Sequence, residues 1–202
     1  NDLRIRLQDL INHSTKLFEE QGVETKNSAT EKEVLNFLKE RMKNILKEKK
    51  IKTDIIEASI SSHVGDNYLD LYKKSLLMNK YINKEEGKNI VSSYKRSFNM
   101  IEKVNKEITG RPDAVLFRQE EEKALFEKIN EIRKDFTVKE DKKNYENLIH
   151  QLSEVKPFTD NFFDKVKVND ENNNIKNNRL ELLKMLCNTF DIFINFSKLE
   201  GF

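Results

Sequence analysis

The sequence predicts an all-α protein, and three observations support this fold class. The 202 residues include only five glycines and two prolines, fewer than many short strands and tight hairpins would require. Apolar residues recur at spacings of three, four and seven, which is the period of a helix rather than of a strand. Leu, Ile, Val and Phe make up about 30% of the chain, enough for a folded core. An all-β fold is therefore excluded.

The first predicted helix runs from Asp2 to Gln21, and Gly22 is a suitable C-terminal stop for it. It begins without an N-cap residue or an initiating methionine, so we expect residue 1 to lie inside a longer protein. Residues 1–24 are therefore assigned to the terminal helix of a preceding domain that this chain lacks. The residues that share its apolar face are Leu3, Leu7, Leu10, Ile11, Leu17 and Phe18.

The main helical domain is predicted to span residues 30–202. Small and polar residues at 25–29 indicate a linker, and Thr30 with Glu33 forms a capping box ahead of apolar residues that recur with the helical period from Val34 to Leu46. Glycines, prolines and the Asn-rich segment 169–174 divide the remainder. The helices predicted there cover 54–62, 67–82, 85–107, 119–135, 139–154, 158–166 and 175–199.

Residues that could carry catalysis or bind a metal are isolated in this sequence. His13, His63 and His150 lack the spacing of metal ligands, and the single cysteine, Cys187, lies in an apolar run typical of a buried side chain. No glycine-rich phosphate loop is present. We therefore predict no catalytic residue and no metal site. The lone cysteine and the lack of a signal peptide or a long apolar run predict a soluble, cytoplasmic protein without membrane association.

The overall charge does not indicate a nucleic-acid-binding protein, but its distribution is uneven. The formal net charge is +2 and the pI is about 8.4, below the value of about 9 that is typical of nucleic-acid-binding domains. Residues 1–110 hold 21 basic and 17 acidic side chains, whereas residues 111–202 hold 16 and 18. A polyanion is therefore expected to dock on the first part of the chain.

The densest basic cluster lies between Lys39 and Lys52, where seven basic side chains face two acidic ones. A helix with such a polar face attracts phosphates through counterion release. The competing interpretation, which charge alone favours, is an ordinary solvated helix. The candidate RNA contacts in this cluster are Lys49, Lys50 and Lys52.

A second candidate is the segment SSYKRSFN at 92–99. Tyr94 offers a ring on which a base can stack, Lys95 and Arg96 offer cations, and Asn99 can bond to base edges. This combination suits a single-stranded RNA loop. Alternatively, the apolar face of the helix takes Tyr94 into the core.

The third candidate, residues 157–186, predicts a short apolar helix, a polar turn and a long helix that opens with Asn178 and Arg179. Asp164 can pair with Arg179 across the turn, because a planar guanidinium suits a partly buried carboxylate. From the residues alone we favour an architectural role over RNA contact.

This third segment resembles the C-terminal pattern of the β subunit of bacterial glycyl-tRNA synthetases, in which FFDxVxV is followed by a turn and NRLxLL. Here the chain has FFDKVKV from residue 162 and NRLELL from residue 178. Further pieces agree in order, so that the similarity covers nearly the whole chain. They are LRIRLQDLI, FLKERMKNILKEKKIKTDIIEA, SYKRSFNMIEK and LFRQEEEKALFEKI.

The resemblance implies a helical bundle of the DALR anticodon-binding type, similar to that of arginyl-tRNA synthetase. It implies that the bundle binds the anticodon stem-loop of tRNA(Gly), while a partner α subunit uses ATP and Mg²⁺ to attach glycine. The fragment itself is then non-catalytic and holds no cofactor. The tRNA-binding role carries over to Tyr94, Lys95, Arg96 and Asn99, and also to Asn178 and Arg179.

Two alternatives remain open. The same fold could serve another synthetase, such as the arginyl enzyme, and anticodon preference separates the two, since a glycine enzyme should require cytosine at the last two anticodon positions. The chain could instead be a helical module that docks on a partner subunit and does not bind RNA. The near-neutral net charge favours this last interpretation.

Overall fold

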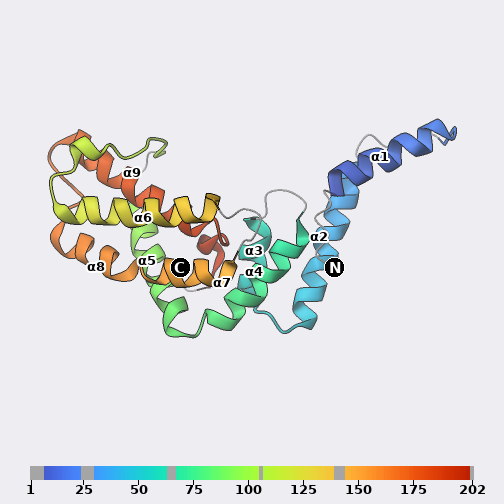
Figure 1. The fold of residues 1–202 in the computed structure, drawn as a ribbon, viewed down its shortest axis with the longest axis horizontal. Coiled ribbons are helices and arrows are strands. Elements are labelled where there is room, and N and C mark those ends of the chain that lie inside the picture. Colours follow the sequence, from blue (N-terminus) through green and yellow to red (C-terminus); the bar gives the residue numbers. More distant parts are fainter. Residues whose placement is uncertain (1–6, 24–29, 63–66, 105–106, 139–143, 201–202) are drawn as a thin grey trace.

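The computed structural model describes residues 7–23, 30–62, 67–104, 107–138 and 144–200. Within these ranges the fold is helical and contains no strand, which confirms the predicted fold class (Figure 1). The helices are α1 (Leu7–Glu20), α2 (Thr30–Glu48), α3 (Thr53–Ser61), α4 (Tyr68–Tyr81), α5 (Glu85–Glu102), α6 (Glu120–Val138), α7 (Tyr145–Ser153), α8 (Lys156–Lys165) and α9 (Asn173–Phe190). Two short 3-10 turns cover Ala114–Leu116 and Phe196–Lys198.

Helices α5 and α9 form the centre of the bundle, with α6, α7 and α8 packed around them (Figure 1). Their facing sides bury apolar residues such as Ile90 on α5 and Leu183 and Leu186 on α9. Cys187 is also buried there, as its apolar context predicts. Burial of this kind contributes roughly 1.5–3 kcal/mol for each large apolar side chain. No helix in the described ranges has the length and apolarity needed to cross a membrane.

Helix α1 extends away from this bundle and packs on α2 (Figure 1). None of its residues is buried, although one face is apolar. Leu10 and Phe18 are 46% and 52% exposed, and Phe37 on α2 is 68% exposed. The helix ends at Glu20, and Gly22 follows in a turn with a φ of 74°, which suits a residue without a side chain. The predicted linker 25–29 and the side chain of Thr30 lie outside the described residues.

The last long helix is shorter than the predicted range 175–199, because α9 ends at Phe190. Beyond it, the Asp191 carboxylate accepts the N–H of Phe196 at 3.1 Å, and the Asn195 carboxamide oxygen accepts the N–H of Ser197 at 3.1 Å. These side chains satisfy backbone groups that a continued helix would otherwise satisfy. No glycine or proline marks the end, so the spacing of apolar residues did not predict it.

Two further boundaries differ from the prediction by five or more residues. Helix α5 ends at Glu102 rather than at residue 107. Helix α7 begins at Tyr145 rather than at residue 139, and its N-cap Asn144 accepts the N–H of Asn147 at 3.0 Å. Asn is among the strongest N-cap residues, so this cap sets the start of the helix. Residues 139–143 lie outside the described ranges.

Candidate functional site

Tyr94, the predicted stacking platform, lies in the core. Its side chain is 1% exposed, and its ring stacks on Phe98 with centroids 5.6 Å apart and also contacts Phe190 and Phe196. Its hydroxyl donates a hydrogen bond to the Asp191 carboxylate at 3.2 Å. Burial raises the pKa of Tyr94 and raises that of Asp191 to about 6. The structure therefore supports the alternative interpretation, because no face of the ring is open to a base.

Arg96 stays at the surface, with its side chain 46% exposed. Its guanidinium lies over the ring of Phe163 at 4.4 Å and forms ion pairs with Asp160 at 3.7 Å and Asp164 at 3.5 Å. All three of these partners belong to α8. The positive charge of Arg96 is thus partly neutralised within the protein.

The other predicted surface residues fall on two separate elements. Lys95 is half-buried and Asn99 is exposed on α5. Lys49, Lys50 and Lys52 are exposed where α2 ends and α3 begins, and none of the three forms an ion pair with a described residue. These lysines form a second cationic surface, called here the α2–α3 corner.

Arg179 is 4% exposed and does not form the predicted pair with Asp164. Its Nε donates to Glu122 on α6 at 2.8 Å, and one terminal nitrogen donates to the carboxylate of Asp170 and to the carbonyl oxygen of Lys167, both at 2.9 Å. The prediction was wrong because Arg179 points from the start of α9 toward α6. The carboxylate of Asp164 instead pairs with Arg96 on α5.

The buried pair of Glu122 and Arg179 ties the chain ahead of α6 to α9. The second carboxylate oxygen of Glu122 accepts the N–H groups of Arg118 and Gln119, both at 2.9 Å. Every oxygen of this fully buried carboxylate therefore has a donor, which buried charges require.

Asn178, also predicted as a tRNA contact, is 2% exposed and holds the backbone of Asp113. Its side-chain oxygen accepts the N–H of Asp113 at 2.6 Å, and its side-chain nitrogen donates to the carbonyl oxygen of Asp113 at 3.0 Å. Asn178 and Arg179 together fasten the segment between α5 and α6 onto α9. We call these two side chains, together with their partners Asp113 and Glu122, the frame.

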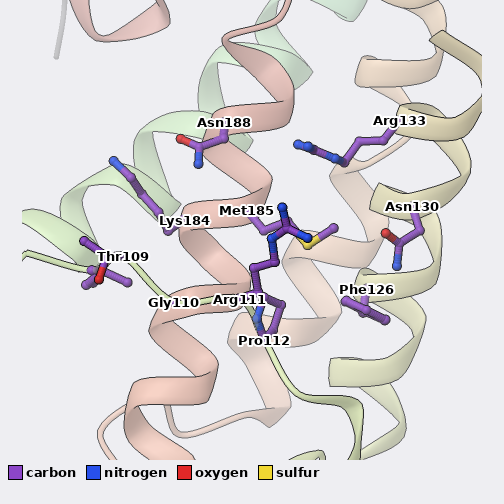
Figure 2. A pocket seen from close by; sticks show the side chains of 11 residues that line it. Thr109, Gly110, Arg111, Pro112, Phe126, Asn130, Arg133, Lys184, Met185 and Asn188 are labelled. Carbon is purple, nitrogen blue, oxygen red and sulfur yellow. The ribbon is translucent and has the colours of Figure 1, made fainter. Parts of the chain in front are cut away.

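The segment held by this frame borders a pocket of about 630 Å³ between α6 and α9 (Figure 2). Arg111 and Arg133 extend into the space between the two helices, and Pro112 and Phe126 lie toward the opposite end of the pocket from Asn188 (Figure 2). Among the described lining residues three are cationic and none is acidic. They are Ile108, Thr109, Gly110, Arg111, Pro112, Phe126, Asn130, Arg133, Lys184, Met185 and Asn188.

Helical spacing brings these side chains to the pocket from both helices. Phe126, Asn130 and Arg133 are separated by four and three residues on α6, so they share one face. Lys184 and Asn188 share a face of α9 for the same reason. Arg133 is further oriented by a hydrogen bond of 3.2 Å to the hydroxyl of Thr189.

The backbone around Arg111 lies close to α9 on one side and is hydrogen-bonded to it on the other. Gly110 lies against the side chain of Glu181, so that a Cβ atom on Gly110 would lie 1.9 Å from a carboxylate oxygen and Glu181 would have to move. Two residues after Arg111, Asp113 is clamped by Asn178. The place of Arg111 over the pocket is therefore set by the frame rather than by a free loop.

The sequence did not predict this pocket. Arg111, Arg133 and Lys184 are 22 and 51 residues apart in the chain, and their surroundings, TGRPD, EIRKD and LLKML, share no motif. Gly110 and Pro112 were informative only as a break between helices. To predict the pocket, one would have to know which faces of α6 and α9 oppose each other.

Comparison with known proteins gives a consistent family. The protein-family model of the DALR anticodon binding domain matches residues 90–194 of this sequence, from α5 to just beyond α9. The glycine-tRNA ligase beta subunit of Rickettsia africae is 33% identical over 199 residues, which is 98% of this chain and 28% of the relative. That of Persephonella marina is 29% identical over 96% of this chain and 26% of the relative. The chain thus spans about a quarter of the length of these curated relatives.

Proposed function

Because this chain belongs to the family of DALR anticodon-binding domains, we propose that it binds the anticodon stem-loop of tRNA(Gly) as part of a glycine-tRNA ligase β subunit. The observation that carries the proposal is the family match over residues 90–194, which includes every lining residue of the cationic pocket. Glycine is favoured over arginine because the curated relatives described above are glycine-tRNA ligase beta subunits.

In this proposal the chain contributes binding energy and selection rather than chemistry. Phosphates of the stem-loop contact exposed cations, and unstacked loop bases are tested by packing and hydrogen bonds. The candidate contacts are the exposed residues of α5 and of the α2–α3 corner, together with the pocket. Attachment of glycine takes place in the cytoplasm on a partner α subunit that uses ATP and Mg²⁺.

The test is fluorescence anisotropy of a labelled glycine anticodon stem-loop with the 202-residue chain over a salt series. A second stem-loop replaces the last two anticodon cytosines. We expect binding that weakens with salt and falls about tenfold or more on replacement, which corresponds to about 1.4 kcal/mol. Absence of binding by a chain that circular dichroism shows to be folded would contradict the proposal for this chain.

We also propose that α1 contacts the remainder of a longer β subunit, in line with the predicted division near residue 24. The support is its exposed apolar face and a groove of about 490 Å³ between α1 and α2 that is lined by Leu10, Phe18 and Leu38, among others. Amide hydrogen exchange in α1 should be slower in a full-length β subunit than in the 202-residue chain. Equal exchange rates would contradict this contact.

A further inference from the structure

The pocket between α6 and α9 combines three kinds of groups that a nucleotide requires. Arg111, Arg133 and Lys184 supply cations for a phosphate. Phe126 and Pro112 supply apolar surface on which a base can pack. The carboxamides of Asn130 and Asn188 supply both donors and acceptors for a base edge.

We propose that this pocket receives one nucleotide that is unstacked from the tRNA anticodon loop. The inference rests on the proposed function and names the place where the loop is read. The phosphate lies among Arg111, Arg133 and Lys184, and the base packs toward Phe126 and Pro112. The volume of about 630 Å³ falls within the range of about 300–1,000 Å³ typical of small-molecule pockets.

The electrostatics of the pocket favour an anion. The three cations converge from α6, α9 and the segment ahead of α6, and the described residues that line the pocket include no carboxylate. The Glu181 carboxylate lies against Gly110, which also lines the pocket.

The geometry of the pocket is held in place before any ligand binds. Arg133 is oriented by Thr189, and the backbone near Arg111 is clamped through Asp113 by Asn178. A site formed in advance spends less binding energy on ordering its side chains. An ordinary surface cluster of lysines has no such support.

Access also fits a loop nucleotide. Arg111 and Asn188 are exposed, whereas Phe126, Asn130 and Arg133 are half-buried. A nucleotide can therefore enter from the side of Arg111 and Asn188 and reach the apolar end. A duplex base pair has no unstacked base to offer, so the pocket should select single-stranded loop nucleotides.

The test uses the 202-residue chain and a labelled glycine anticodon stem-loop whose loop nucleotides are made abasic one at a time. For the unmodified chain, one abasic position should weaken binding about tenfold or more. Asn188→Trp fills the pocket and keeps its charge. It should bind the intact loop as weakly as the unmodified chain binds that abasic loop, and it should no longer distinguish the two.

Charge is tested separately by a matched pair of variants. Arg111→Ala should weaken binding about fivefold and lower the slope of log K against log salt by about one, because one phosphate contact is lost. The control Arg118→Ala removes an exposed arginine of the same segment outside the pocket and should change affinity less than twofold. Circular dichroism confirms that each variant is folded.

The outcomes separate this inference from the proposed function. If the unmodified chain binds the stem-loop and folded Asn188→Trp retains full affinity and discrimination, the pocket inference is overturned and anticodon binding stands. If the unmodified chain binds no stem-loop, both are overturned. The expected loss of discrimination in Asn188→Trp supports both.

Discussion

The two cationic surfaces of this protein differ in construction. At the α2–α3 corner Lys49, Lys50 and Lys52 are exposed where one helix ends and the next begins. In the pocket, by contrast, cations from three elements face one space. They are supported by a buried frame that includes Arg179.

This difference separates attraction from selection. Exposed lysines attract any polyanion, and salt screens that attraction. Arginines that lie beside amides and apolar groups in one pocket can also distinguish one nucleotide from another. We therefore expect the corner to contribute sequence-independent affinity and the pocket to contribute discrimination.

The largest effect is expected when the side chains that support the pocket are removed. Arg179→Ala leaves the buried carboxylate of Glu122 without its cation, and breaking a buried pair in this way costs about 3–5 kcal/mol. Urea unfolding should show that loss in the free energy of unfolding. The control Arg118→Ala should change it by less than about 0.5 kcal/mol. A loss below 1 kcal/mol for Arg179→Ala would show that the pair does not hold the frame.

A pH series tests how the buried carboxylate of Asp191, which follows the last residue of α9, affects the stability of the fold. Burial raises the pKa of Asp191 to about 6, above its ordinary value of 3.8, so the folded state binds this proton more tightly. The resulting stabilisation is full below about pH 4 and is lost as pH rises through 6. Relative to Asp191→Asn, the unmodified chain should lose about 2–3 kcal/mol of unfolding free energy over that window. Parallel pH profiles for the two proteins would contradict this assignment.

The corner can be tested by replacing its three lysines with glutamine. The triple variant Lys49→Gln, Lys50→Gln, Lys52→Gln should bind every stem-loop several-fold more weakly and lower the salt slope by about two to three. Preference for the anticodon cytosines should not change. A changed preference with an unchanged salt slope would reverse the roles assigned to the two surfaces.

The smallest effect is expected for Arg96, which is exposed like the corner lysines but forms ion pairs within the protein. Arg96→Ala should leave the free energy of unfolding within about 1 kcal/mol, because its ion pairs with α8 are exposed. Stem-loop affinity should fall about two- to threefold, since Asp160 and Asp164 already balance much of its charge. Affinity equal to that of the unmodified chain would remove Arg96 from the binding surface.

Sequence alone was sufficient for the helical class and for most of the helices, because the period of apolar residues is a local property. It also predicted Cys187 as a buried side chain. It did not predict where α9 ends, since the stop depends on side-chain bonds of Asp191 and Asn195 and not on glycine or proline. The resemblance to the synthetase family rested on ordered motifs and agrees with the match to the DALR domain.

Tertiary structure decided the role of individual residues. Tyr94 and Arg96 are separated by one residue, yet packing places the first in the core and the second at the surface. From the residues alone an architectural role was favoured for the segment of Asn178 and Arg179, but only the structure shows that their partners are Asp113 and Glu122. The pocket itself exists only because α6 and α9 bring Arg133 and Lys184 together with Arg111. Periodicity shows which face of a helix is polar, but only packing shows what that face meets.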